Sequence, residues 1–207
     1  MELSVPDLLP IGGAAFAVDR LSAFFVVIIS LGAIPAALYA IGYTREYAGK
    51  HSIAGMAFAF NVFVAAMILV ALARNVLTFL ALWELMSLAS YFLVITEHER
   101  DETLRAGWVY LVMTHAGFAV LFLGFLLLAQ ATGTMSFSEW GAVAAKLDTT
   151  SRNVIFVLFA LGFGSKAGII PLHVWLPLAH PAAPSHVSAL MSGVMIKLGV
   201  YGLVRRF

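Results

Sequence analysis

Apolar segments long enough to cross a lipid bilayer dominate the sequence. Six of them can be traced, at residues 20–43, 52–73, 76–96, 106–130, 154–176 and 185–204. A helix rises 1.5 Å per residue, so about 20 residues cross a hydrocarbon core of roughly 30 Å. Apolar residues make up 62% of the chain and charged residues 11%, whereas soluble domains carry about 25% charged residues. We therefore predict an all-α integral membrane protein with about six transmembrane helices.

The composition also excludes several classes of site. The net charge of +1 gives no electrostatic reason to expect nucleic acid or another polyanion as a partner. The chain has no cysteine, which excludes disulfides, thiolate metal sites and cysteine-ligated iron–sulfur clusters from it. We assign no cofactor or metal site to this chain. Residues 1–19 lack a basic n-region and do not resemble a cleaved signal peptide, and residues 1–207 are predicted to form a single transmembrane domain.

Three charged residues stand inside the apolar segments. Lys166 and Lys197 are the only formally charged residues between positions 153 and 204, and Glu84 lies near the middle of segment 76–96. A lysine at the centre of a transmembrane helix costs about 2.5–3.5 kcal/mol on insertion scales, and such residues mark ion or proton pathways by default. We therefore predict that Glu84, Lys166 and Lys197 transfer protons.

The segment at 154–176 is predicted to be a discontinuous helix, broken between Gly164 and Pro171. Glycines surround Lys166 in this segment, and the proline removes an amide donor and clashes with the preceding turn. Broken backbone at membrane depth is tolerated only where it is buried in protein or lines water. We therefore expect Lys166 inside the bundle, and a proline-rich turn before the last segment.

Each charged residue also has a purely structural explanation. Glu84 shares a predicted helix face with Ser87, which fits either proton transfer or a helix–helix hydrogen bond. Lys166 is expected to pair with Glu84, and that pair is compatible with both explanations. Lys197 shares a predicted face with His186, and snorkelling of the lysine to the membrane interface is the alternative.

The histidines are candidate relay residues. His115 lies in the fourth segment, His173 follows the predicted break, and His186 opens the last segment. Histidine changes charge near neutral pH and can pass protons between fixed groups. A satisfied core histidine is the alternative for each of them, and His115 has no polar residue one turn away on its own helix. His51 and His98 are expected to be solvated loop residues.

Two polar connections interrupt the apolar segments. Residues 97–105 form the most charged run of the chain, and we expect a solvated loop there. Residues 132–152 mix glycine, hydroxyl and charged residues. We expect this second connection to lie at the membrane interface as a short helix, with Trp140 as its aromatic anchor.

Together these groups suggest a way to move protons. Burial disfavours a charged amine, and a nearby carboxylate restores the charge. At an effective dielectric near 20, moving the Glu84 carboxylate from about 4 Å to about 8 Å from the amine weakens the attraction from roughly 4 to roughly 2 kcal/mol. A modest displacement would therefore switch Lys166 between holding and releasing a proton. Lys197 is the natural acceptor on the next helix.

Two stretches resemble a known family. They are SKAGIIPLHVWLPLAHPAAPSHVSALMSGVMIKLGVYGLVR, within residues 163–205, and LWELMSLASYFLV at residues 82–94. Both are similar to the antiporter-like proton-translocating subunits of respiratory complex I (NADH:quinone oxidoreductase), Mrp sodium/proton antiporters and membrane-bound hydrogenases. The first stretch most resembles the branch of hydrogenase-4 component B or formate hydrogenlyase subunit 3. Complex I relatives usually carry an acidic residue where Leu178 stands.

The resemblance implies a role for each candidate residue. Glu84 matches the ion-pair glutamate of the family, Lys166 the lysine of the broken helix that pairs with it, and Lys197 the connecting lysine on the following helix. His115 falls where hydrogenase-type members carry a histidine. Family members contain two inverted five-helix repeats, an arrangement found in many transporters, and one repeat is recognisable here. The sequence is either a piece of a longer subunit, which we favour, or a short relative that needs a partner.

The implied function is proton translocation as a multi-pass cell-membrane subunit of a hydrogenase-like or NADH dehydrogenase-like complex. Iron–sulfur clusters and nickel–iron or flavin centres would then lie on partner subunits that form a peripheral redox arm. A subunit of a sodium/proton antiporter is the main alternative. A haem anchor ligated by His115 and His173, and a scaffold whose buried ion pair sets helix register, are two further alternatives.

Overall fold

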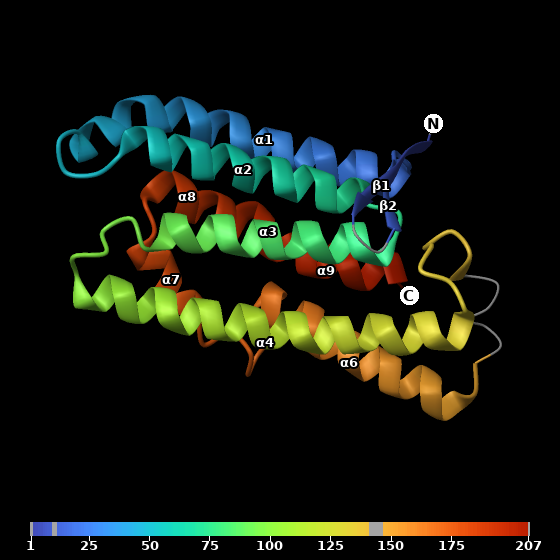
Figure 1. The fold of residues 1–207 in the computed structure, drawn as a ribbon. Coiled ribbons are helices and arrows are strands. Elements are labelled where there is room, and N and C mark those ends of the chain that lie inside the picture. The colour runs from blue at the N-terminus through green and yellow to red at the C-terminus, as the bar shows by residue number, and fades with distance from the viewer. Residues whose placement is uncertain (1, 10–11, 141–146, 207) are drawn as a thin grey trace.

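The computed structural model describes residues 2–9, 12–140 and 147–206. A two-stranded hairpin precedes a bundle of long helices that run side by side (Figure 1). The elements are β1 (Glu2–Leu9), β2 (Gly12–Ala17), α1 (Arg20–Tyr43), the 3₁₀ helix η1 (Thr44–Tyr47), α2 (Ile53–Leu72), α3 (Val76–Val94), α4 (Asp101–Thr132), α6 (Thr149–Ala167), α7 (Leu176–Ala182), α8 (Ser185–Leu190), the π-helical η2 (Met191–Met195) and α9 (Ile196–Arg206).

The predicted all-α membrane architecture is confirmed. In the described part of the chain, five helical stretches are long and apolar enough to cross a membrane, namely Arg20–Tyr47, Ile53–Leu72, Val76–Val94, Asp101–Thr132 and Ser185–Arg205. The fifth predicted segment corresponds to α6, which is not among the five. The antiparallel hairpin of β1 and β2 was not predicted from the sequence.

Side-chain caps explain why several helices begin close to the predicted boundaries. Asp19, Ser52, Asn75 and Asp148 precede α1, α2, α3 and α6, and each accepts a hydrogen bond from the backbone amide three residues later. Such caps satisfy amides that have no partner within the helix. Each of these helices therefore starts at a polar residue, followed at once or within about a turn by an apolar run.

The two ends of the bundle differ. Both chain termini, the hairpin and the connection between α4 and α6 lie at one end, whereas the α1–α2 and α3–α4 connections and α7 lie at the other (Figure 1). At the first end, Asp19 Oδ2 lies 3.0 Å from Arg74 Nη1 and 2.7 Å from Arg205 Nη1. One carboxylate therefore joins the start of α1 to the α2–α3 link and to the last turn of α9.

Glycines allow α4 and α6 to pack closely. A Cβ atom at Gly162 of α6 would lie 2.5 Å from the Leu121 side chain, and one at Gly124 of α4 would lie 2.9 Å from the Phe159 ring. Small residues let helix backbones approach in this way, which is typical of membrane bundles. The contact fixes how α6 presents its last turn to α3 and α4.

The predicted break in the fifth segment is confirmed. Helix α6 ends at Ala167, and Gly168 adopts φ 72°, a left-handed conformation that glycine takes without strain. The Ser165 carbonyl, freed by the helix end, accepts hydrogen bonds from the Gly168 amide at 3.3 Å and from Trp175 Nε1 at 2.9 Å. The chain continues through turns into the short helix α7. The broken backbone is thus satisfied inside the protein, as its depth requires.

Trp140 was predicted to anchor the protein at the membrane interface, and that prediction is wrong. Its side chain is buried, its Nε1 donates to the Thr134 carbonyl at 3.0 Å, and its ring lies 4.9 Å from that of Phe137 and 5.9 Å from that of Phe125. An aromatic cluster below the α4–α6 connection holds it because packing against rings removes more apolar surface from water than an interfacial position. The helix predicted over 132–152 falls partly on residues 141–146, outside the described residues.

Candidate functional site

Lys166 lies where three helices converge. It occupies the last turn of α6, its exposed fraction is 3%, and its Nζ donates to Ser87 Oγ of α3 at 2.9 Å and to Tyr110 Oη of α4 at 3.2 Å. The position inside the bundle agrees with the expectation from the broken helix. A buried ammonium group needs such acceptors because nothing else replaces its hydration.

Tyr110 connects this lysine to a wider polar network, and the sequence analysis missed it. Its hydroxyl lies 2.6 Å from Ser90 Oγ and 3.7 Å from Met195 Sδ, and its ring lies 5.1 Å from the ring of Trp175. The residue is completely buried. The signal available in the sequence was a phenol hydroxyl in an uncharged segment, five residues before His115.

Glu84 pairs with His115 across the α3–α4 contact. Glu84 Oε1 lies 2.7 Å from His115 Nε2, which is a short hydrogen-bond distance. The other ring nitrogen, Nδ1, lies 2.9 Å from the Leu111 carbonyl oxygen. A carbonyl can only accept, so Nδ1 carries a proton and donates it. The contact between Nε2 and Oε1 therefore holds one further proton, either on the imidazole or on the carboxyl group.

The direct pair predicted between Lys166 and Glu84 is not formed. Within the described residues, no ion pair joins them, and Lys166 instead reaches Ser87, which is three residues after Glu84 on α3. The Glu84 carboxylate is turned towards α4 and takes His115 as its partner. It still interacts electrostatically with the Lys166 amine. Glu84 Oε2 is buried and has no hydrogen-bond partner among the described residues, so one oxygen is free to take another.

Lys197 occupies a different environment. Its side chain is exposed on the surface of the described bundle, and its Nζ donates to the Ser192 carbonyl at 2.5 Å. That carbonyl belongs to the π-helical η2, whose wider turn changes the backbone pairing that an α-helix would have. The expected position of Lys197 on a shared face with His186 is wrong, because η2 rotates the residues after it and His186 is buried while Lys197 is not.

The remaining predicted relay histidines lie apart from these groups. His186 is buried against the rings of Tyr43 and Phe60, and its Nδ1 has no hydrogen-bond partner among the described residues. His173 also has a buried, unpartnered Nδ1, but it lies beyond the end of α6 and does not continue the helix face of Lys166. A relay through His173 or His186 stays a prediction.

The haem alternative loses its support. Both ring nitrogens of His115 are engaged, Nδ1 with Leu111 and Nε2 with Glu84. An axial ligand must offer one nitrogen to iron. The arrangement instead joins proton-carrying side chains of α3, α4 and α6, namely Glu84, Ser87, Tyr110, His115 and Lys166.

Comparison with known proteins places this arrangement in a family. Residues 73–207 match the family described as NADH:quinone oxidoreductase/Mrp antiporter, transmembrane. The chain belongs to this family. The matched range contains every residue of the polar network and also Lys197. The resemblance noted in the sequence is therefore confirmed.

Individual relatives agree with this assignment. The chain is 47% identical over 199 residues to an uncharacterised protein of Mycobacterium tuberculosis, covering 96% of this chain and 30% of that protein. It is 43% identical over 187 residues to hydrogenase-4 component B of Escherichia coli, covering 90% of this chain and 27% of that protein. The chain thus spans less than a third of the length of the curated relatives it matches.

The fold has also been seen in a solved structure. A chain of the membrane-bound sulfane sulfur reductase, described as an archaeal respiratory membrane complex, superimposes with a TM-score of 0.85 and 28% sequence identity, covering 99% of this chain and 32% of that one. The broken helix and the bundle around it are therefore family features rather than peculiarities of this chain.

Proposed function

We propose that this chain moves protons across the cell membrane as part of a membrane subunit of a hydrogenase-like or NADH dehydrogenase-like complex. The observation that carries the proposal is the pair of proton-holding centres one helical turn apart on α3. Glu84 and His115 share a proton at one centre, and Ser87 and Tyr110 hold the Lys166 amine at the other. Such centres inside a membrane bundle usually mark a proton pathway.

The two centres can influence one another through charge. At an effective dielectric near 20, a carboxylate about 8 Å from an ammonium group attracts it by roughly 2 kcal/mol. When the shared proton moves onto Glu84, this attraction disappears, and Lys166 releases its proton more easily. When the proton moves to His115, the Glu84 carboxylate is charged again. The free Oε2 of Glu84 offers a position for a water or the amine during the exchange.

Hydroxyl groups provide the path for the proton leaving Lys166. Tyr110 and Ser90 lie in hydrogen-bond contact, and each hydroxyl can accept and donate at once. Lys197 is the proposed acceptor on the following helix, reached through water, with His173 and His186 as further relay candidates. Lys197 lies on an uncovered face of this chain, and we propose that further protein covers it in the working complex.

The test is proton pumping by the intact complex in inverted membrane vesicles, followed with a pH-sensitive dye. Lys166→Ala and Glu84→Gln are expected to lower pumping at least tenfold while the complex still assembles. Arg45→Ala changes an exposed cation in η1, just beyond α1, and should leave pumping unchanged. Normal pumping by the Lys166 or Glu84 variant would reject the proposal, and loss of assembly in both would favour the scaffold alternative.

A second candidate is a subunit of a sodium/proton antiporter, favoured by the Mrp antiporter description of the matched family. The two candidates differ in their driving reaction. A pump needs electron transfer, and the iron–sulfur, nickel–iron or flavin centres for it would lie on partner subunits in a peripheral arm. An antiporter needs only a sodium gradient. Sodium-dependent proton flux in vesicles without a redox substrate would favour the antiporter.

A further inference from the structure

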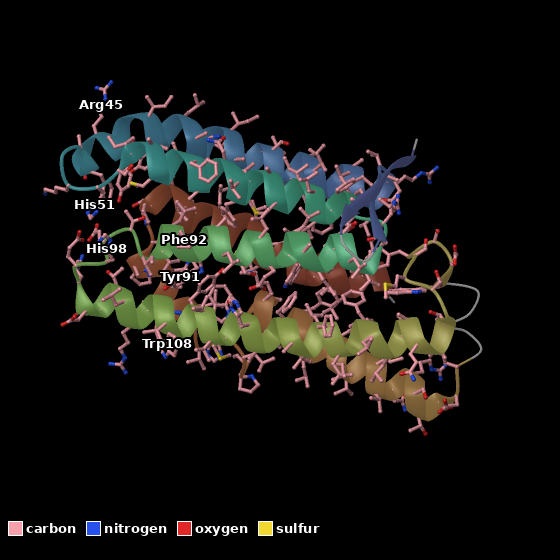
Figure 2. All side chains as sticks on the ribbon, viewed as in Figure 1. Arg45, His51, Tyr91, Phe92, His98 and Trp108 are labelled. Atoms are coloured by element: carbon pink, nitrogen blue, oxygen red, sulfur yellow. The ribbon has the colours of Figure 1, made fainter. Side chains whose placement is uncertain are left out.

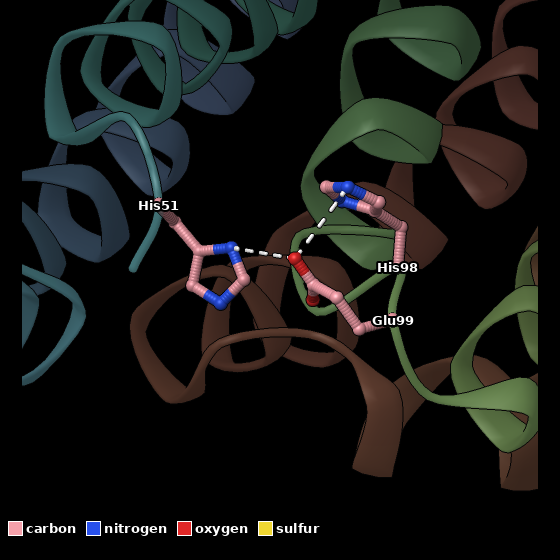
Figure 3. Close-up of side chains that lie close together, drawn as sticks. All are labelled: His51, His98 and Glu99. Atoms are coloured by element: carbon pink, nitrogen blue, oxygen red, sulfur yellow. Dashed lines mark ion pairs between the residues drawn. The ribbon is translucent and has the colours of Figure 1, made fainter. Parts of the chain in front are cut away.

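Three side chains with metal-ligating atoms meet at the end of the bundle that lies away from the termini. His51 directly precedes the cap of α2, and His98 and Glu99 lie in the connection between α3 and α4. Figure 2 shows His51 and His98 close together at this end, and Figure 3 shows both rings directed towards the Glu99 carboxylate. The sequence analysis placed the two histidines in separate solvated loops, yet the His51 side chain is only 12% exposed.

The distances fit shared ligands of one ion better than hydrogen bonds. Glu99 Oε1 lies 3.8 Å from His51 Nδ1 and 3.5 Å from His98 Nε2, beyond the 2.7–3.2 Å of a typical hydrogen bond. Atoms bound to one tetrahedral zinc ion at roughly 2.0–2.1 Å lie about 3.4 Å from one another. All three ligand atoms lie within 4.8 Å of one another. A small rotation of the exposed His98 ring brings them to ligand spacing.

The surroundings admit an ion and leave these ligands available. A polar pocket of about 360 Å³ is lined by His51 and Glu99 together with Glu46, Glu97 and other residues of the two connections. Glu97 is already engaged, with Oε1 accepting from Tyr47 at 3.1 Å and Oε2 from Arg100 at 3.0 Å. The Arg100 cation is therefore balanced locally, and the Glu99 carboxylate remains to neutralise part of the charge of a bound cation.

We propose that His51, His98 and Glu99 form a binding site for a divalent transition-metal ion of the zinc type, with water completing the coordination. Two imidazoles and one carboxylate are a typical ligand set for zinc with an open position. Imidazole ligands favour zinc, copper and nickel, whereas magnesium prefers oxygen ligands. A bound ion would tie the α1–α2 connection to the α3–α4 connection, at the end of the bundle where α7 also lies.

The test is Zn²⁺ titration of the full-length protein in detergent, by calorimetry and by competition with a chromogenic chelator. His98→Gln and Glu99→Gln are each expected to weaken Zn²⁺ binding at least tenfold, and Mg²⁺ should not compete. Because a ligand that binds only the folded state stabilises it, Zn²⁺ should raise the Tm of the wild-type protein. The matched control is Glu102→Gln, which removes a carboxylate from the neighbouring first turn of α4 and should bind Zn²⁺ normally.

Cu²⁺ provides a structural readout. Its EPR spectrum should show nitrogen coupling from two imidazoles, and from one after His51→Gln or His98→Gln. His98 is 63% exposed, so its variant tests the proposal even if replacement of His51 disturbs folding. Zn²⁺ binding that is as tight in His98→Gln as in the wild type, or equal loss of binding in Glu102→Gln, would overturn the proposal. Neither result depends on proton translocation.

Discussion

Lys166 and Tyr110 meet inside the bundle, with the amine nitrogen 3.2 Å from the phenol oxygen and 5.4 Å from the ring centroid. The phenol thus accepts a hydrogen bond from the amine and also presents its electron-rich face to the cation. The buried lysine is held by neutral hydroxyl groups rather than by a carboxylate in direct contact. Its charge state can then respond to a proton shift in the Glu84–His115 pair.

Tyr110→Phe keeps the ring and removes the hydroxyl. We expect proton pumping to fall about tenfold or more, because a hydrogen bond to a charged group contributes about 1.5–3 kcal/mol and the hydroxyl link to Ser90 is lost as well. Pumping in vesicles measures the effect. Assembly and Tm should change little compared with Lys166→Ala, since ring packing against Trp175 is retained. Full pumping by Tyr110→Phe would show that the phenol has no part in the pathway.

The pair of Glu84 and His115 should behave as one unit. His115→Gln and Glu84→Gln each remove the shared proton, so the double variant should pump no worse than either single variant. Groups that act together show such non-additivity. The measurement is a double-mutant cycle on pumping rate, with assembly checked in parallel. Independent, additive losses would mean that the 2.7 Å contact is structural only.

The close contact between α4 and α6 should be sensitive to one added methyl group. Gly162→Ala would place a Cβ atom 2.5 Å from Leu121, and overpacking of this kind costs about 1–3 kcal/mol. We expect a lower Tm and reduced pumping, because α6 carries Lys166. Gly42→Ala is the matched control, since nothing lies within 4 Å of the added atom there and alanine favours a helix by up to about 1 kcal/mol. Equal Tm values for the two variants would contradict this account of the packing.

The Asp19 carboxylate should support the terminal end of the bundle over a wide pH range. Burial alone would raise its pKa, but hydrogen bonds from Ser22 and Arg205 and the charge of Arg205 outweigh burial and hold the pKa well below its usual range. A lowered pKa in the folded state gives a stabilisation that is present above the unfolded pKa of about 3.9 and is lost as the pH falls towards the folded value.

Asp19→Asn isolates this effect, because asparagine can still cap α1. We expect a loss of about 1 kcal/mol, since the carboxylate is 39% exposed and exposed ion pairs contribute about 0–1 kcal/mol each. The difference in Tm between wild type and variant should stay constant from pH 8 to pH 5 and shrink below about pH 4. A difference that disappears between pH 8 and pH 5 would disprove the assignment of the charge to Asp19.

Much of the fold could be read from the chain because its determinants are local. The segment lengths follow from the thickness of a bilayer, the helix starts from capping side chains such as Asn75, and the break after Ala167 from glycine and proline next to Lys166. Each of these depends on backbone hydrogen bonding within a few residues.

The partners of the polar groups depended on the tertiary structure instead. Glu84 and His115 are 31 positions apart and Lys166 and Ser87 are 79 positions apart, and they meet only because of how α3, α4 and α6 are rotated about their axes. Close packing at Gly162 sets one of these rotations, and the π-helical turn before Lys197 sets another. The sequence by itself determined which segments enter the membrane and which charged residues they carry, while side-chain packing decided which of those residues touch.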